Sequence, residues 1–235
     1  TRDDMIMQLS FIRNRIPTYK GYGRATVDDI FTPEELEGAY YKEGDNFRTL
    51  ILLNEGNERF EIKELPAEVQ FAPVFGILPA DINSDGNIDI LITGNDYSIE
   101  PMSGRIDAFN GLVLTGEGNG DFEVIKVRKA GFKVSGDAKG LARIFDADGN
   151  ELFLATQNKD SVQLYRKTAE HKFFKVPDDA QWVEITMKNG SIRKHEIYYG
   201  SSYLSQSSRS LALTPEMVII RIFDSAGQVL SVQDL

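Results

Sequence analysis

The sequence contains no cysteine and only two histidines among its 235 residues. Without cysteine, a disulfide framework, a thiolate metal site and a cysteine nucleophile are all excluded. The two histidines, His171 and His195, leave little material for an imidazole-bound zinc site or a serine–histidine–aspartate triad. Chemistry carried by carboxylates, most simply the binding of a hard cation, is therefore favoured.

Two further absences concern membranes and nucleic acids. No run approaches the roughly 20 apolar residues that a membrane-spanning helix needs. Acidic residues outnumber basic ones by 36 to 26, which gives a formal net charge of −10. This balance argues against nucleic acid as a partner, because a phosphate backbone is bound by a basic face. With 41% hydrophobic residues, the chain still has enough apolar material for a folded core.

Composition divides the chain into three parts, of which residues 1–48 form the helical one. Asp3 and Asp4 can cap a first segment whose apolar residues stand at helical spacing. Thr32–Glu35 is a capping box with proline at the first helical position, which predicts a helix from about Pro33 to Tyr41. Because helices this short are rarely stable alone, we expect them to pack against the rest of the chain.

Residues 49–177 contain short apolar runs separated by glycine, asparagine and aspartate, a pattern typical of antiparallel strands. We expect strands at Thr49–Leu53, Ile88–Thr93, Leu112–Leu114, Phe122–Val127, Leu152–Thr156 and Val162–Tyr165.

Two motifs in this part recur with nearly the same spacing. Glu55-Gly56-Asn57 returns 62 residues later as Glu117-Gly118-Asn119, and a phenylalanine follows both copies. Asp85-Gly86-Asn87 returns 63 residues later as Asp148-Gly149-Asn150, and a threonine follows both copies. A repeat of this length made of short strands is typical of a β-propeller or a similar array. We therefore expect a mainly β protein whose antiparallel blades are of propeller type, with about two blades and part of a third.

The last part, residues 178–235, is expected to be a small separate β module. Gln181–Met187 and Ile192–Tyr198 flank Asn189-Gly190, a pair that favours the type I′ turn of a tight hairpin. Further strands are expected at Leu211–Leu213, Met217–Phe223 and Val229–Val232.

The clearest chemical motif, at residues 81–89, runs into the expected strand Ile88–Thr93, and we expect it to have a strand–loop–strand setting. Oxygen-bearing side chains stand at loop positions 1, 3, 5 and 9, as Asp81, Asn83, Asp85 and Asp89. Calcium takes about six to eight oxygen ligands, which a tight loop supplies from alternate side chains and from a main-chain carbonyl at position 7, here Asn87. A glycine at position 6 allows the sharp turn. The sequence therefore predicts a calcium site formed by these five residues.

The loop differs from an EF-hand, because Ile92 stands where that motif needs glutamate and Ile88–Thr93 is a strand-like run. The alternative is a turn rich in asparagine and aspartate that holds no metal. Without a cation, the three aspartates would repel one another by about 1 kcal/mol or more per pair. In the second copy, positions 1 and 9 are Ile144 and Leu152, so Asp146–Asn150 is expected to keep the turn without tight ion binding.

The pattern Asp-x-Asn-x-Asp-Gly-x-x-Asp, followed by an aliphatic strand, resembles the FG-GAP/VCBS repeats of integrin-like β-propellers and bacterial surface proteins. Val74–Ala80 is similar to the lead-in of that family. The resemblance implies calcium bound by the side chains at positions 1, 3, 5 and 9 and by the carbonyl of Asn87. Tyr199–Ser208 is similar to a segment of the ASPIC/UnbV domain that often follows such repeats. Leu211–Thr214 and Phe223–Gly227 depart from the pattern of that domain.

These observations predict a non-enzymatic calcium-binding module that serves adhesion or binds a glycan or protein ligand. An extracellular or cell-surface location is expected, such as the bacterial outer membrane surface or the periplasm, because calcium loops of modest affinity suit the calcium outside cells. Since a closed propeller needs about 4–8 blades, we expect contact with further blades or self-association. The alternative function is a carbohydrate-active hydrolase or lyase, or an accessory domain of one, which would use paired carboxylates.

Overall fold

Strands predominate in the computed structural model, which describes residues 1–168 and 172–235. Strand accounts for 39% of the chain and helix for 12%, which confirms the expected mainly β class. The described residues form five antiparallel sheets, and no closed barrel or propeller is found among them. The chain divides into two units, Thr1–Phe47 and Arg48–Leu235.

The first unit contains four short helices around a small apolar core. They are α1 (Arg2–Gln8), α2 (Ile12–Arg15), α3 (Tyr19–Tyr22) and α4 (Val27–Ile30). Thr1 caps α1, because its side chain accepts the backbone amide of Asp4. The helices are held together by four buried isoleucines, Ile6, Ile12, Ile16 and Ile30. Packing of this kind stabilises helices that are too short to persist alone.

The helix predicted from Pro33 to Tyr41 is wrong. Its capping box forms, because the Thr32 amide donates to Glu35 Oε2 at 2.8 Å and the Glu35 amide donates to Thr32 Oγ1 at 3.3 Å. The chain then makes only turns, and Gly38 adopts a positive φ of 77°. A left-handed glycine only a few residues after the cap leaves too little chain for the cooperative growth of a helix.

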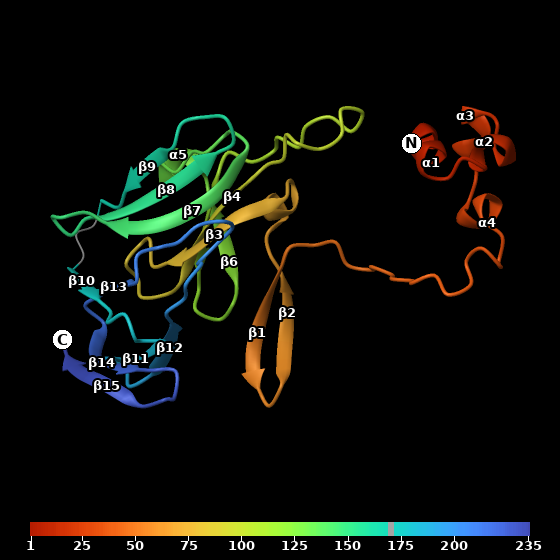
Figure 1. Ribbon diagram of the computed structural model, residues 1–235. Coiled ribbons are helices and arrows are strands. Elements are labelled where there is room, and N and C mark those ends of the chain that lie inside the picture. The colour runs from red at the N-terminus through yellow and green to blue at the C-terminus, as the bar shows by residue number, and fades with distance from the viewer. Residues whose placement is uncertain (169–171) are drawn as a thin grey trace. The chain divides into compact units, whose positions relative to one another are not determined.

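The second unit begins with a hairpin and continues as two larger sheets (Figure 1). The hairpin pairs β1 (Leu50–Gly56) with β2 (Arg59–Glu64). A four-stranded meander follows, built from β3 (Val74–Ala80), β4 (Asp89–Gly94), β5 (Leu112–Gly116) and β6 (Phe122–Ile125). The next sheet contains β7 (Ala138–Phe145), β8 (Glu151–Gln157) and β9 (Gln163–Arg166). Short helices η1 (Ala67–Gln70) and α5 (Val127–Ala130) lie in the connections.

The C-terminal part of this unit contains two smaller sheets. One pairs β10 (Lys172–Lys175) with β13 (Ser210–Leu213). The other has the strand order β12-β11-β14-β15 and consists of β11 (Trp182–Met187), β12 (Ile192–Glu196), β14 (Met217–Phe223) and β15 (Val229–Asp234). The predicted hairpin around Asn189-Gly190 is confirmed as β11–β12. The strands expected from the sequence are all present, β14 with its expected ends and the others with at least one end shifted. No bounds were predicted for β2, β3, β7 and β10.

Apolar clusters cover both faces of the β3–β6 sheet. Leu91 packs on one face with Leu141 and Phe153, which belong to β7 and β8. Its neighbour Ile92 packs on the other face with Leu114. Because successive side chains of a strand point to opposite faces, a strand that is buried on both faces has no polar alternation. The C-terminal sheets have a separate core, and residues of these sheets line a cavity together with residues of the loop at 81–89.

Gly76 on β3 is a position where no side chain fits. A Cβ there would lie 2.3 Å from Thr93 Oγ1 and 2.8 Å from Leu141 Cβ. We expect Gly76→Ala to lower the free energy of unfolding by about 1–3 kcal/mol, because overpacking shifts β3 against β4 and β7. Chemical denaturation measures the change. The control is Gly23→Ala, where the nearest atom would lie 3.5 Å away; equal effects of the two substitutions would contradict the proposed clash.

Candidate metal centre

The loop at residues 81–89 connects β3 to β4, which are adjacent antiparallel strands. Ala80 and Asp89 are partners in the strand register, so the two ends of the loop meet. The strand–loop–strand setting predicted for this motif is therefore confirmed. Gly86 has a φ of +87°, the left-handed conformation that glycine adopts without strain.

The polar side chains of the loop accept hydrogen bonds from its own backbone. The Gly86 amide donates to Asp81 Oδ2 at 3.0 Å, and the Asn87 amide donates to Asp85 Oδ1 at 2.7 Å. The Asp85 amide donates to Asn83 Oδ1 at 2.9 Å. Burial acts to raise the pKa of Asp85, but the donors from Asn87 and Asn83 outweigh it and lower the pKa. These bonds hold the side chains at positions 1, 3 and 5 in a folded turn.

Asp89 is fully buried and closes the base of the loop. Its Oδ2 accepts the backbone amides of Ile82 at 2.8 Å and Asn83 at 3.2 Å. Its Oδ1 accepts the amide of Gly116 on β5 at 3.0 Å. Burial raises the pKa of Asp89, although the three amides act in the opposite direction. Since a carboxylate has about four acceptor sites, Asp89 keeps one for a further ligand.

Asp81 carries the observation that bears most directly on a metal. Its Oδ1 is buried and has no hydrogen-bond partner in the described part of the chain. A buried carboxylate oxygen without a donor is costly unless a cation or water approaches it. This oxygen and the donor set of carboxylate, amide and carbonyl groups fit a hard cation such as calcium. In the described ranges, however, no three acidic or histidine side chains converge as a metal cluster, so Asn83 and the Asn87 carbonyl would have to contribute.

The second loop, Asp146–Asn150, keeps a turn in which the carboxylate of Asp146, at position 3, accepts three hydrogen bonds. The side-chain amide of Asn150 donates to Asp146 Oδ2 at 2.8 Å, and its backbone amide donates to Asp146 Oδ1 at 2.8 Å. These donors, the side chain of Asn150 first, lower the pKa of Asp146. Gly149 has the same φ of +87° as Gly86. With Ile144 and Leu152 at positions 1 and 9, this loop lacks two of the side-chain oxygens that the first loop offers to an ion.

Two cationic side chains bind the backbone of the first loop from distant parts of the chain. Lys167, just after β9, donates to the Asp81 carbonyl, and Arg193 on β12 donates to the Gly86 carbonyl. The Lys167 side chain is only 5% exposed. The loop is therefore a junction between the β3–β6 sheet, the β7–β9 sheet and the C-terminal sheets.

Behind this junction lies a buried charge cluster that the sequence analysis missed. The Glu151 side chain is 2% exposed, and its carboxylate lies 3.6 Å from Arg143 and 3.8 Å from Lys167. Burial lowers the pKa of both Arg143 and Lys167, and the charge of Glu151 opposes that effect. The sequence does contain a signal for this buried glutamate. Alternate residues of a strand share a face, and Glu151 therefore lies on the same face of β8 as the buried Phe153 and Ala155.

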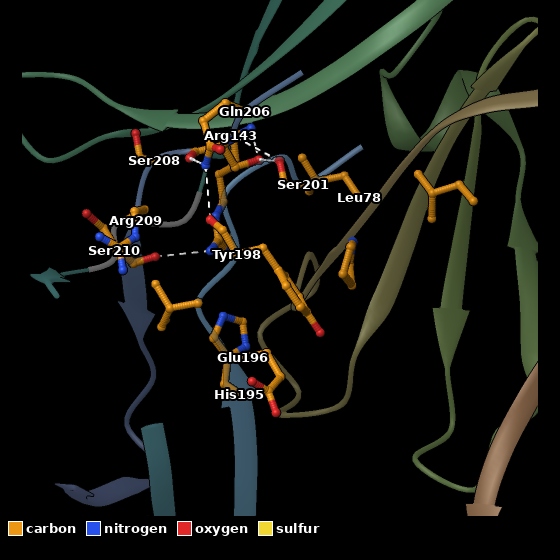
Figure 2. Close-up of a pocket in the computed structure, with 14 residues that line it drawn as sticks. Leu78, Arg143, His195, Glu196, Tyr198, Ser201, Gln206, Ser208, Arg209 and Ser210 are labelled. Carbon is orange, nitrogen blue, oxygen red and sulfur yellow. Dashed lines mark hydrogen bonds between the residues drawn. The ribbon is translucent and has the colours of Figure 1, made fainter. Parts of the chain in front are cut away.

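The serine-rich segment at residues 199–208 binds exposed strand edges. Figure 2 shows Ser201, Gln206 and Ser208 beside Arg143. The Arg143 amide donates to Ser207 Oγ at 3.0 Å, and the Ser208 amide donates to the Arg143 carbonyl at 2.7 Å. Ser202 Oγ accepts the amide of Ile77 on β3 at 3.0 Å. The hydroxyl groups therefore satisfy backbone groups of β3 and β7 that have no strand partner on that side.

Of the two histidines, His195 lies in the described part of the chain. His195 lies on β12 beside Glu196 and faces the pocket drawn in Figure 2. Burial lowers its pKa, and the charge of Arg143 lowers it further. His171, the other histidine considered from the sequence, lies outside the described residues.

No family model matches the chain, and no curated protein sequence matches it either. No helix in the described ranges is both long and apolar enough to cross a membrane. The resemblances to FG-GAP/VCBS repeats and to the ASPIC/UnbV domain therefore remain predictions.

Removal of the Glu151 charge should destabilise the protein. Glu151→Gln removes the ion-pair partner of the buried Arg143 and Lys167, so we expect a loss of about 3 kcal/mol in the free energy of unfolding. Urea denaturation measures it. The control is Glu123→Gln on the exposed side of β6, where no more than about 0.5 kcal/mol is expected. A loss at Glu151 no larger than that of the control would show that the cluster does not stabilise the fold.

His195 should make stability depend on pH. Because its folded pKa lies below 6.5, the unfolded chain takes up a proton before the native one as the pH falls. The free energy of unfolding is then expected to decrease as the pH falls through about 6.5. His195→Gln should remove this part of the decrease, measured by urea denaturation between about pH 7.5 and 5.5. The prediction fails if the wild type and His195→Gln lose the same free energy of unfolding over this pH range.

Proposed function

We propose that this protein is a non-catalytic calcium-binding β module that serves adhesion or binds a glycan or protein ligand. The observation that carries the proposal is the buried Oδ1 of Asp81, which has no donor in the described part of the chain. It stands in a loop whose side chains at positions 1, 3, 5 and 9 all present oxygen. Calcium bound by Asp81, Asn83, Asp85 and Asp89, and by the carbonyl of Asn87, would neutralise the charges of three aspartates.

The mechanism we propose is structural. The ion would fix the loop, whose carbonyls at positions 1 and 6 are held by Lys167 and Arg193. Lys167 directly follows the β7–β9 sheet, and Arg193 belongs to the C-terminal sheets. An ordered loop would therefore hold both of these parts in place. A recognition surface made by several sheets would then depend on calcium, although the ion itself would not touch the ligand.

The relation to FG-GAP/VCBS propeller blades is part of the proposal and is supported by matching positions in the two sheets. Gly76 on β3 faces Thr93, since a Cβ would lie 2.3 Å from its Oγ1. Gly140 on β7 faces Thr156 in the same way, at 2.8 Å. Thr93 and Thr156 are the threonines of the sequence repeat. The same glycine–threonine contact in β3–β4 and β7–β8 favours a common origin of the two hairpins as blades.

The relation of the C-terminal sheets to the ASPIC/UnbV domain is likewise proposed. It is supported by the serine-rich segment, whose backbone and hydroxyl groups bind β3 and β7. An extracellular or surface location is proposed because a loop with this ligand set suits the calcium concentration outside cells. For a hydrolase or lyase, two carboxyl groups would have to face each other across a cleft. The buried Glu151 instead has two cations as ion-pair partners, which favours binding over catalysis.

Calcium should stabilise the wild type, and Asp85→Asn should abolish that stabilisation. At a calcium concentration about 100-fold above Kd, a ligand that binds only the native state adds about 2.7 kcal/mol, which corresponds to a rise in Tm of roughly 5–10 °C. Asparagine retains the acceptor for the Asn87 amide but removes the charge. Thermal melts with calcium and with chelator, together with calorimetric calcium titration, measure the effect.

The matched control is Asp148→Asn, at the equivalent position of the second loop. This variant should retain the calcium-dependent rise in Tm. If calcium does not raise the Tm of the wild type, or if Asp85→Asn keeps the full rise, the calcium site is ruled out.

A further inference from the structure

A cavity of about 420 Å³ lies between the calcium-loop motif and the C-terminal sheets. Asp81, Gly86 and Ile88 of the loop form one side of it, and residues of β11, β12, β13 and β14 form another. Its volume falls within the range of about 300–1,000 Å³ that is usual for small-molecule sites. The cavity is therefore large enough for a small organic ligand.

One part of the cavity lining is apolar. It contains Ile185, Leu211 and Met217, all of which belong to or pack against the core of the C-terminal sheets. Ile88 adds an aliphatic side chain from the loop. These side chains would contact an apolar portion of the ligand and exclude water from it.

The polar part of the lining has a surplus of hydrogen-bond donors. Arg143 lines the cavity, and its Nε is buried without a partner in the described ranges. The hydroxyl of Thr214 is likewise buried and unpartnered in those ranges. Arg193 has five N–H donors, of which one is bound to the Gly86 carbonyl. A ligand that matches this lining must supply acceptors.

The charges of the lining favour an anion. The side chains of Arg143, Lys167 and Arg193 are cationic, and Asp81 is the acidic residue among those that line the cavity. Glu151, which is not a lining residue, pairs with Arg143 and Lys167, so the charge left for a ligand is mainly that of Arg193. The ammonium of Lys194, another lining residue, is engaged elsewhere, because it pairs with Glu196 and lies 4.7 Å from the Trp182 ring centroid. Arginine in particular binds carboxylate and phosphate groups through paired N–H donors.

We infer that this cavity binds a small organic oxyanion, with its charged group at Arg143, Lys167 and Arg193 and its apolar body against Ile185, Leu211 and Met217. The inference goes beyond the proposed function and does not require calcium in the neighbouring loop. Carboxylates and phosphate esters share the required chemistry.

The test is a calorimetric titration of the full chain without added calcium, using hexanoate, hexyl phosphate, hexanol and hexylammonium as probes. Hexanoate or hexyl phosphate should bind saturably. Hexanol and hexylammonium should bind about tenfold more weakly or not at all, because they lack the group that accepts charge-assisted hydrogen bonds. The anion that binds with the higher affinity, hexanoate or hexyl phosphate, identifies the class of oxyanion. Methyl NMR shifts of Ile185 and Met217 locate the site.

Two variants and a control connect binding to the cavity. Arg193→Gln keeps a donor for the Gly86 carbonyl but removes the charge, so anion affinity should fall by about tenfold. Thr214→Val removes only a hydroxyl and should weaken binding by about threefold. The control is Arg221→Gln on β14, whose side chain is 43% exposed and lines no part of this cavity; it should bind like the wild type. Thermal melts check that each variant is folded.

Three results would overturn the inference. The first is the absence of saturable binding by both anions. The second is equal affinity for hexanol, which would show an apolar cavity without anion recognition. The third is wild-type affinity in both Arg193→Gln and Thr214→Val, which would place binding elsewhere. Because no calcium is added, none of these results depends on whether the loop binds a metal.

Discussion

The structure of the second unit depends on one buried carboxylate, that of Asp89. It accepts two amides of its own loop and one from Gly116, so a single side chain on β4 joins the loop to β5. Burying a carboxylate is unfavourable unless hydrogen bonds replace the lost water. Three backbone donors supply that replacement, and the same bonds satisfy amides that a tight loop would otherwise leave unpaired. The loop geometry therefore follows from Asp89 before any metal is considered.

The two related loops show how similar turns can differ in what they need. In the second copy, Ile144 and Leu152 stand at positions 1 and 9, and the side chain of Asn150 donates to Asp146, the residue at position 3. In the first loop, position 1 is Asp81, and one oxygen of its carboxylate is buried without a donor in the described chain. An unmet acceptor near further carboxylates is a place where a cation stabilises the native state. The comparison explains why calcium is proposed for one loop and not for the other.

The sequence predicted features that depend on local pattern and missed those that depend on distant contacts. β14 was predicted with its observed ends, Met217–Phe223, because its aliphatic run is uninterrupted. The bounds of β3 were missed because Gly76 and Pro79 interrupt its apolar pattern, although Gly76 is required there by Thr93 and Leu141. The contact of Lys167 with Asp81 spans 86 residues, and no local spacing encodes it. The loop residues were identified from spacing alone, whereas the cations that hold the loop were not.

The junction around the loop explains why the C-terminal sheets belong to the same unit as the repeat-like sheets. Their own core is separate, so apolar packing alone would allow them to move as an independent domain. Polar contacts prevent this: Arg193 binds the loop backbone, and the serine-rich segment binds the edges of β3 and β7. Such contacts are directional, and breaking one forfeits a hydrogen bond of defined geometry. An interface of this kind fixes one relative position of the layers, and that position is what creates the cationic cavity between them.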